Sequence, residues 1–392
     1  MRIVRNRAYK YITHTTTPCL LLGLFTNYMQ SQASRMARSS GSRPVALVLL
    51  ALCAAALSSA TVTVNEPIAN GLSWSFYDVS CPSVEGIVRW HVAEALRRDI
   101  GIAAGLIRIF FHDCFPQGCD ASVLLSGSNS EQIEVPNQTL RPEALKLIDD
   151  IRAAVHAVCG PTVSCADITT LATRDAVVAS GGPFFEVPLG RRDGLAPASS
   201  DLVGTLPAPF FDVPTLIESF KNRSLDKADL VALSGAHTVG RGHCVSFSDR
   251  LPPNADDGTM DPAFRQRLTA KCASDPSGNV VTQVLDVRTP NAFDNKYYFD
   301  LIAKQGLFKS DQGLINHPDT KRAATRFALN QAAFFDQFAR SMVKMSQMDI
   351  LTGSAGEIRR NCSVRNTALG DVSSSAHQLE TTAGDEGLAA DA

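Results

Sequence analysis

Apolar residues recur at helical spacing along most of the middle of this 392-residue chain. The pattern begins behind Pro82, a residue that suits the first turn of a helix. Val84, Val88 and Val92 follow at intervals of one turn. Similar runs predict further helices over residues 103–115, 143–158, 165–179, 214–220, 227–233, 262–271, 292–304, 320–329 and 331–347. Strand patterns are scarce, with the best at residues 185–187. The chain is therefore predicted to be all-α with long loops.

Residues 36–60 are predicted to be a secretory signal peptide. Arg38 and Arg43 precede an apolar run, and small residues follow it at the place of cleavage. The run is too short to span a membrane as a helix. Met36 is then expected to be the true start, with residues 1–35 an over-extended N-terminus; the alternative is a genuine basic extension.

The other end of the chain also departs from the helical pattern. Residues 367–392 are rich in Ala, Gly, Ser, Asp and Glu and nearly lack aromatic residues. Such a composition cannot bury enough apolar surface to fold, so we expect a disordered tail or a C-terminal propeptide. One domain, residues 61–366, remains between the two ends.

Charge and cysteine content narrow the classes of function. The formal net charge is −2, without blocks of one sign, so no nucleic-acid partner and no membrane partner is expected. Two of the ten cysteines, Cys19 and Cys53, lie in the N-terminal segments, which leaves eight in the predicted domain. An even set in a secreted chain implies disulfides, although their pairing stays open. No Cys-x-x-Cys pair occurs, which argues against structural zinc and covalently attached haem.

One apolar helix carries two polar residues that stand out. Arg108 and His112 are four positions apart within residues 103–115, so they share one face, one turn apart. An unpaired buried charge is costly, so a buried Arg needs a reason. The pair is a candidate catalytic site; the alternative is an Arg paired with a carboxylate beside a core His.

A second pattern follows this helix directly. Asp113, Asp120 and Ser122 offer hard oxygen ligands, and Pro116 and Gly118 fall where a loop can turn its carbonyls inward. Oxygen ligands from a short loop suit calcium, although the spacing is not that of an EF-hand. Two cysteines within this loop are close enough to bond to each other.

Several blocks of the sequence, in the same order, resemble the plant secretory (class III) haem peroxidase family. The clearest are residues 111–115, 118–122, 163–167, 189–193, 229–238, 293–298 and 358–362. The resemblance covers roughly residues 74–366 and depends on several independent motifs rather than one. It implies the haem peroxidase fold, in which haem lies between a distal and a proximal helical half and there is very little strand.

The resemblance implies an enzyme that reduces hydrogen peroxide to water through an oxo-ferryl intermediate and oxidises small phenolic donors by one-electron steps. His237 matches the proximal ligand of haem b, and Asp311 matches the carboxylate that binds its other nitrogen. His112 matches the distal acid–base group, and Arg108 matches the residue that stabilises the charge developing as the O–O bond breaks.

Three further residues match the family's distal pocket. Asn137 matches the acceptor for the second N–H of His112, Glu131 the next member of that chain, and Phe111 the pocket wall. Asn137 also begins an Asn-Gln-Thr sequon, and a glycan there would exclude the hydrogen bond to His112. We expect the buried network, with Asn222 as the better glycan position.

The resemblance also implies two calcium ions, four disulfides and a donor site. The distal calcium would bind Asp113, Pro116, Gly118, Asp120 and Ser122. The proximal calcium would bind Thr238, Asp286, Thr289, Ala292 and Asp294. The disulfides would be Cys81–Cys159, Cys114–Cys119, Cys165–Cys362 and Cys244–Cys272. Pro207 matches a residue at the rim of the donor site, and Val135 stands where an aromatic residue is common, which predicts an altered donor preference.

Two other functions compete with this one. A calcium- and haem-containing cell-wall protein with little turnover is disfavoured because the full set of matching catalytic residues is present. An intracellular ascorbate-type peroxidase is disfavoured by the signal and the cysteines. We expect a monomer that is secreted to the extracellular space or cell wall, with the vacuole as the alternative.

Overall fold

The computed structural model describes residues 61–62, 64, 66–254 and 258–366, which all belong to one compact unit. The predicted signal peptide, the segment before it and the C-terminal tail lie outside the described residues. Over the ranges that the structure describes, no helix combines the length and apolarity needed to cross a membrane.

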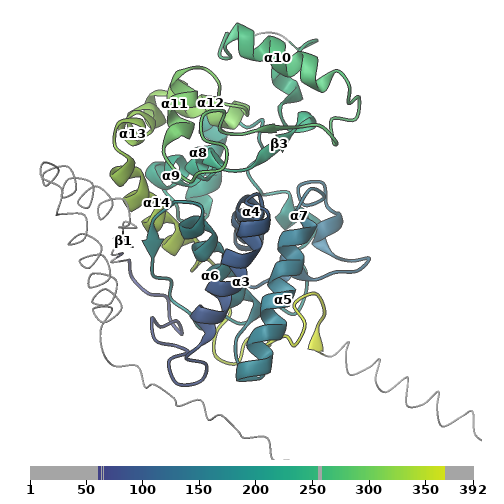
Figure 1. Ribbon diagram of the computed structural model, residues 1–392, viewed down its shortest axis with the longest axis vertical. Helices are drawn as coiled ribbons and strands as arrows, with labels where there is room; N and C mark the ends of the chain where they lie inside the picture. The colour runs from purple at the N-terminus through teal and green to yellow at the C-terminus, as the bar shows by residue number, and fades with distance from the viewer. Residues whose placement is uncertain (1–60, 63, 65, 255–257, 367–392) are drawn as a thin grey trace, which may run out of the picture. The chain divides into compact units, whose positions relative to one another are not determined.

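Helices dominate the described chain, which confirms the all-α prediction (Figure 1). The α-helices are α3 (Val84–Arg98), α4 (Ile102–Cys114), α5 (Pro142–Cys159), α6 (Cys165–Ala179), α7 (Ser200–Val203), α8 (Val213–Asn222), α9 (Lys227–Ser234), α10 (Pro262–Cys272), α11 (Lys296–Ile302), α12 (Lys309–Asn316), α13 (Pro318–Leu329) and α14 (Gln331–Met345). Short 3-10 turns are η1 (Ser122–Leu124), η2 (Glu131–Ile133), η3 (Gly235–Thr238) and η4 (Cys244–Arg250).

The N-terminal half is built around α6. Every residue from Cys165 to Val177 is buried, because α3 and α4 pack against this helix and α5 contacts it as well. The Ser164 side chain caps its start by accepting a hydrogen bond from the backbone N–H of Asp167. Figure 1 shows α3, α5 and α6 together in the lower half, with α4 at the boundary to the upper half. Helix α4 is thereby held where the two halves meet.

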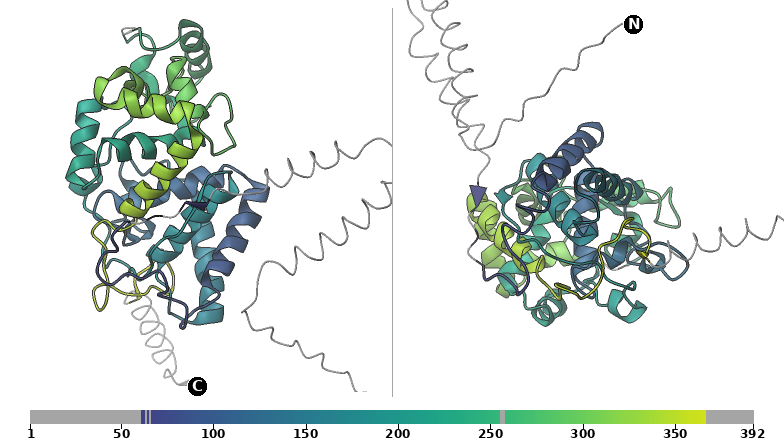
Figure 2. Two further views of the ribbon diagram at one scale, coloured as in Figure 1. Left: turned by 90° about the vertical axis from the view of Figure 1, so that its left-hand side faces the viewer. Right: turned by 90° about the horizontal axis from the view of Figure 1, so that it is seen from below.

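The C-terminal half contains α8, α9 and α11–α14, and α14 packs against α9 while α13 packs against α11 and α12. Aromatic rings fill the space between these helices: Phe334 contacts Phe293 and Tyr298 with ring centroids 5.9 and 5.1 Å apart. The turned view in Figure 2 shows the same division into two halves. This packing fixes the segment η3, which follows α9 directly.

Strands are few and short. β1 (Thr61–Val62) pairs in parallel with β2 (Phe184–Phe185), and β3 (Arg241–His243) pairs antiparallel with β4 (Thr282–Val284). The strand predicted at residues 185–187 is therefore displaced by one residue and shorter. Helix formation at residues 292–304 also begins later than predicted, at Lys296, because the preceding residues form a loop around Thr238.

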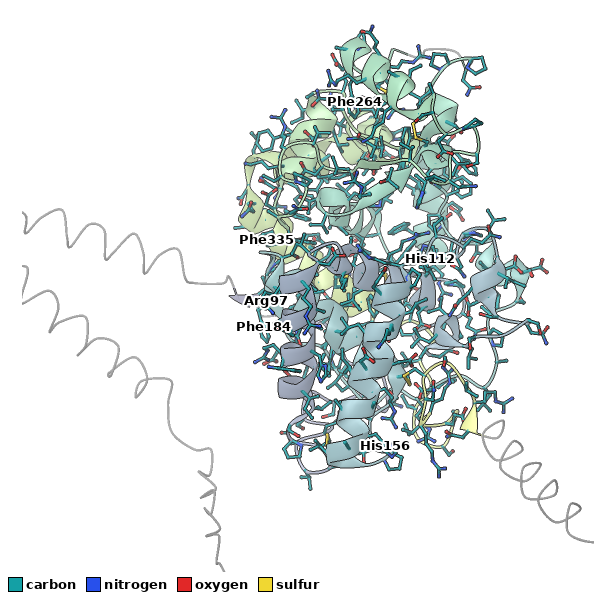
Figure 3. All side chains as sticks on the ribbon, turned by 45° about the vertical axis from the view of Figure 1, so that its right-hand side comes forward. Arg97, His112, His156, Phe184, Phe264 and Phe335 are labelled. Carbon is teal, nitrogen blue, oxygen red and sulfur yellow. A yellow bond between two sulfur atoms is a disulfide. The ribbon has the colours of Figure 1, made fainter. Side chains whose placement is uncertain are left out.

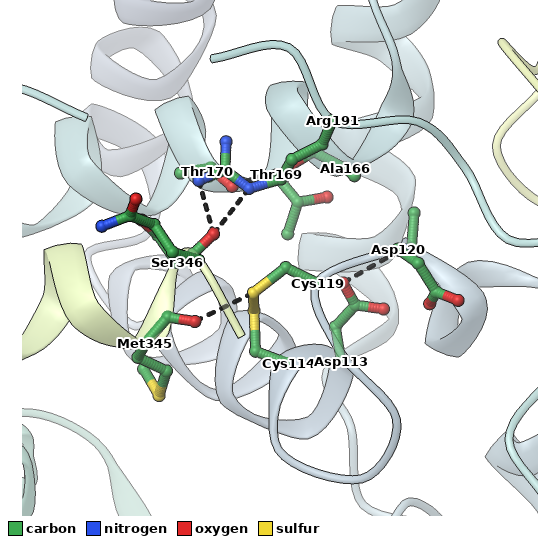
Figure 4. The surroundings of a disulfide bond; sticks show 12 residues. Asp113, Cys114, Cys119, Asp120, Ala166, Thr169, Thr170, Arg191, Met345 and Ser346 are labelled. Atoms are coloured by element: carbon green, nitrogen blue, oxygen red, sulfur yellow. Dashed lines mark hydrogen bonds between the residues drawn. A yellow bond between two sulfur atoms is a disulfide. The ribbon is translucent and has the colours of Figure 1, made fainter. Parts of the chain in front are cut away.

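Four disulfides form, three of them between distant parts of the chain, and their pairs are those that the resemblance implies. They are Cys81–Cys159, Cys114–Cys119, Cys165–Cys362 and Cys244–Cys272. Arg191, which lies near the second of them (Figure 4), forms a fully buried ion pair with Asp167, with 2.7 Å between guanidinium nitrogen and carboxylate oxygen. The same guanidinium donates to the carbonyl oxygen of Ser346, so its charge is well hydrogen-bonded.

Candidate active site

Helix α4 is buried on most of its surface but leaves one strip partly open. Ala104, Arg108 and Phe111 are half-buried, whereas their neighbours on the helix are buried. Their spacing of four and three residues places them on one face. His112 lies beside this strip, and Figure 3 shows it where the N-terminal helices meet the upper half.

Arg108 is held by backbone carbonyls. Its guanidinium donates to the carbonyl oxygens of Thr139 at 2.7 Å and Pro136 at 2.8 Å. A third hydrogen bond reaches the Thr139 hydroxyl at 3.0 Å, and Arg108 Nε lies 3.2 Å from His112 Nε2. No carboxylate among the described residues pairs with Arg108, and burial lowers its pKa to about 10. Its charge therefore remains available beside His112.

His112 is oriented by Asn137. The imidazole Nδ1 lies 2.6 Å from Asn137 Oδ1, and Asn137 Nδ2 donates to the carbonyl oxygen of Glu131 at 2.9 Å. Because the amide nitrogen is used in this way, the oxygen faces His112 and Nδ1 must donate. Burial and the nearby charge of Arg108 lower the pKa of His112 to about 3, against the opposing effect of the Asn137 hydrogen bond. His112 is thus neutral, and its unprotonated Nε2 accepts from Arg108 Nε.

Asn137 and Glu131 both lie inside the protein. Asn137 is 1% exposed, and the sequon hydroxyl of Thr139 already bonds Arg108. Glu131 joins the network through its backbone carbonyl, while its side-chain Oε1 accepts from the backbone N–H of Ala198 at 3.0 Å. The buried geometry leaves no room for a glycan on Asn137.

The loop behind α4 gathers oxygen atoms around two buried carboxylates (Figure 4). Asp113 accepts hydrogen bonds from the backbone of Ala121, and Asp120 Oδ1 accepts from the backbone of Ser122. Gly118 has φ +122°, and a Cβ there would collide with the backbone oxygen of Asp349. A side chain at Gly118 would therefore open the loop.

The charge in this loop is not balanced by the protein alone. Burial raises the pKa of Asp113 well above its usual value, and the charge of Asp120 raises it further. Burial likewise raises the pKa of Asp120. The buried Ser122 hydroxyl and Glu131 Oε2 have no hydrogen-bond partner within the described chain. A hard cation bound by Asp113, Asp120 and Ser122 would balance the carboxylate charge and give the Ser122 hydroxyl a partner, so these residues fit calcium.

His237 lies in η3, in the C-terminal half of the domain. Its Nδ1 is 2.7 Å from Asp311 Oδ1, and Asp311 also accepts from the hydroxyl of Tyr297 at 2.9 Å. The second carboxylate oxygen accepts from the backbone N–H of Phe308 at 3.0 Å. Since a carboxylate only accepts, Nδ1 donates this hydrogen bond, and Nε2 is the ring nitrogen left to bind a ligand. The His237 side chain is 37% exposed.

The residues around both histidines fit haem. On the proximal side Leu233 and Ala236 are half-buried like His237, as are Ala104, Arg108 and Phe111 on the partly open strip of α4. A flat apolar ring would cover both strips, and His237 Nε2 would bind its iron. The hydrogen bond from His237 to Asp311 is the kind that fixes the orientation of a metal-binding imidazole.

A second group of oxygens surrounds Thr238, the residue after His237. The Thr238 hydroxyl lies 3.0 Å from Asp286 Oδ2, 3.3 Å from the Ala292 carbonyl and 3.4 Å from Asp294 Oδ1. The Thr289 hydroxyl lies 3.0 Å from the same Asp294 oxygen. One hydroxyl proton cannot satisfy three acceptors, so this cluster also fits a hard cation.

The cluster around Thr238 includes two hydroxyl oxygens and a carbonyl oxygen besides carboxylates. Across residues 61–366, apart from the few that the structure leaves undescribed, no three His, Cys, Asp or Glu side chains are placed together to hold a metal.

Comparison with known proteins settles the family. The family model described as peroxidase matches residues 88–330. The chain belongs to the plant peroxidase family. It is 53% identical to Peroxidase 12 of Arabidopsis thaliana over 307 residues, which cover 77% of this chain and 85% of that protein. It is also 53% identical to Cationic peroxidase SPC4 of Sorghum bicolor over 309 residues, covering 78% of this chain and 84% of that protein.

This class III peroxidase is therefore a haem enzyme that uses hydrogen peroxide to oxidise a donor, and the low-turnover alternative is not favoured. Haem and calcium are general features of the family, and its class III members are typically secreted.

In this peroxidase the segment containing Pro207 connects the two sides of the site. Before it, the Ser200 hydroxyl donates to Glu134 Oε1 at 2.6 Å, beside Val135. After it, the backbone N–H of Ser310 donates to the carbonyl oxygen of Pro209 at 2.9 Å. Val135 is 80% exposed, so a donor can contact it.

Sequence reasoning missed two contributors to the peroxidase site. Thr139 entered it only as part of a sequon, yet this residue provides two acceptors to Arg108. Tyr297 belonged to a matching block without a role, yet it bonds Asp311. Neither contact has a local sequence signal, because each joins residues far apart in the chain.

Proposed function

We propose that His112 is the acid–base catalyst of this peroxidase and that Arg108, Asn137, Glu131 and Phe111 support it. The observation that carries the proposal is the neutral His112, whose Nδ1 is bound to Asn137 and whose unprotonated Nε2 accepts a hydrogen bond from Arg108 Nε at 3.2 Å, which places its lone pair beside the guanidinium. A general base must be unprotonated and oriented before substrate arrives.

His112, Arg108 and Phe111 have different roles in the reaction with hydrogen peroxide. His112 Nε2 takes the proton from one oxygen of hydrogen peroxide and returns it to the other, which leaves as water. Arg108, still positively charged, stabilises the negative charge that develops on the departing oxygen. Phe111 walls the pocket and excludes bulky molecules. Haem b, held by His237, would supply the redox chemistry of O–O cleavage and of one-electron oxidation of donors.

His237 would hold the haem iron, with Asp311 orienting its imidazole. Two calcium ions would complete the structure. The distal ion would bind Asp113, Pro116, Gly118, Asp120 and Ser122. The proximal ion would bind Thr238, Asp286, Thr289, Ala292 and Asp294. Because Thr238 follows His237 directly, the proximal ion would steady the iron ligand.

Small phenols are the proposed donors, bound near Pro207 and Val135 at the rim of the site. The enzyme would act as a secreted monomer in the extracellular space or cell wall, with the vacuole as the alternative. The cysteine pairing is consistent with an oxidising compartment, since all eight cysteines of residues 61–366 are in disulfides.

Replacement of the distal base tests the catalytic assignment. His112→Gln should slow the reaction with hydrogen peroxide by about 10²–10⁴-fold, the usual contribution of a positioned acid–base group. Stopped-flow absorbance of the haem band measures this rate. His156→Gln is the control, because His156 lies on α5 at the far end of the N-terminal half (Figure 3). A His112→Gln enzyme that binds haem and reacts as fast as the wild type would refute the assignment.

A further inference from the structure

One carboxylate oxygen on the proximal side serves two donors. Asp311 Oδ1 lies 2.7 Å from His237 Nδ1 and 2.9 Å from the hydroxyl oxygen of Tyr297. Both are normal hydrogen-bond distances, and both donors meet the same atom. Asp311 is 2% exposed, so no bulk water competes for that oxygen.

The shared use of Oδ1 is imposed by the surrounding structure. The other oxygen, Oδ2, accepts from the backbone N–H of Phe308 at 3.0 Å, which prevents the carboxylate from rotating. Tyr297 is 1% exposed on α11, and its ring lies edge-on to the His237 imidazole at 6.1 Å. Neither Tyr297 nor Asp311 can move away without disrupting a packed core.

Two donors on one oxygen weaken each other. A carboxylate oxygen that already accepts a hydrogen bond has less negative charge to offer a second donor. The hydroxyl of Tyr297 therefore weakens the hydrogen bond between Asp311 and the Nδ1–H of His237. The strength of that hydrogen bond sets how much negative charge the imidazole carries, and so how strongly it donates to a bound metal.

We propose that Tyr297 is a positioning residue that limits the strength of the Asp311–His237 hydrogen bond and thereby sets the reduction potential of the haem. The inference rests on the proposed role of His237 as the iron ligand. Tyr297 touches neither haem nor substrate in this scheme, and acts only through Asp311.

The variant Tyr297→Phe removes the hydroxyl and keeps the ring. Asp311 Oδ1 then serves His237 alone, so the imidazole becomes more negative and stabilises ferric haem. The reduced-to-oxidised ratio at fixed potential should fall about fivefold, as for one net hydrogen bond. For a one-electron couple that is a fall of about 40 mV in midpoint potential. The iron–histidine stretching vibration of the ferrous enzyme should move to higher frequency in resonance Raman spectra.

The neighbouring Tyr298 provides a matched control. Tyr298 is equally buried, and its hydroxyl donates to the carbonyl oxygen of Val231 at 2.9 Å, away from Asp311. Tyr298→Phe therefore loses one buried hydrogen bond but should leave the potential and the vibration unchanged. Asp311→Asn should move both in the opposite direction, since it removes the carboxylate charge.

The possible failures are distinguishable. If the wild-type ferrous enzyme shows no iron–histidine vibration, His237 is not the ligand and the proposed function fails. If that vibration is present but the Tyr297→Phe variant matches the wild type, the role of Tyr297 is refuted. Equal shifts in the Tyr297→Phe and Tyr298→Phe enzymes would also refute it, because a general packing effect would explain both.

Discussion

Asn137 and Asn222 begin sequons of the same type but differ in what surrounds them. The Asn137 side chain is buried, with its oxygen facing His112 and its nitrogen bonded to Glu131. Asn222 is exposed at the end of α8. The same motif therefore has a structural role at one position and is free for modification at the other.

Glycopeptide mapping of the protein expressed through a eukaryotic secretory pathway checks this difference. A sugar is expected on Asn222 and none on Asn137, because a glycan and the His112 hydrogen bond cannot share one amide. Ser224→Ala, which removes the sequon but keeps Asn222, should abolish the modification. A sugar found on Asn137 would contradict the buried network.

Val135 is the residue most expected to influence donor choice. A phenylalanine at this exposed position would offer a ring to an aromatic donor, worth about 0.5–1.5 kcal/mol. Val135→Phe should therefore lower KM for phenols by about two- to tenfold and leave KM for iodide unchanged. Val280→Phe is a control at a site of similar exposure, 78%, in a distant loop. An unchanged ranking of donors in steady-state assays would count against this role.

For single residues, the sequence predicted which side chains form the site better than it predicted their hydrogen-bond partners. The identities of Arg108, His112 and His237 follow from motifs, because their chemistry requires those side chains. The acceptors for Arg108 do not, since Thr139 and Pro136 contribute backbone carbonyls that any residue possesses. Hydrogen bonds to backbone groups therefore cannot be predicted from residue types.

Among the elements, the loop after α10 is organised by one carboxylate. Asp275 accepts from the backbone N–H groups of Gly278, Val280 and Val281 and from the Ser277 hydroxyl. These hydrogen bonds, with that from Val281 first, lower the pKa of Asp275 to about 2. The carbonyl oxygen of Val281 in this loop accepts a hydrogen bond from the backbone N–H of Cys244.

Acid should loosen this loop before the rest of the domain. A carboxyl whose pKa is lowered on folding stabilises the folded state above its unfolded value of about 3.9, and this contribution fades as pH falls towards 2. Amide hydrogen exchange of Val280 and Val281, corrected for the intrinsic rate, should accelerate over that range. Asp275→Asn should exchange fast at every pH, whereas Asp150→Asn, at a surface ion pair, should behave as wild type. Protection of the Val280 and Val281 amides from exchange that does not change with pH would contradict stabilisation of the loop by ionised Asp275.

Helix α6 was predicted from the sequence and helix α12 was not, and the two differ in what stabilises them. The predicted bounds of α6 equal the observed ones, because a long apolar run and a serine cap define it. Helix α12 was not predicted, since its eight residues are mostly polar and include Gly313. Tertiary contacts stabilise α12, including the hydrogen bonds of Asp311 to His237 and Tyr297.

For the whole molecule, the disulfides differ most in the length of chain they close. Cys165–Cys362 joins residues 197 positions apart, and Cys114–Cys119 joins residues five apart. In the chain-entropy model the long loop is worth about 5 kcal/mol and the short loop about 2 kcal/mol. Paired Cys→Ala variants compared by urea unfolding should show this order. Equal losses in the free energy of unfolding would contradict the entropic account.

The long bridge also bears on how the protein is made. Cys362 is the last cysteine of the chain, whereas Cys81 and Cys159 are among the first of the domain to leave the ribosome. Domains begin to fold from the N-terminus during synthesis. The first bridge can therefore close while translation continues, but the bond that joins α6 to the C-terminal segment must wait until nearly the whole domain has been synthesised. Closure of this bridge is thus one of the last steps in the folding of the domain.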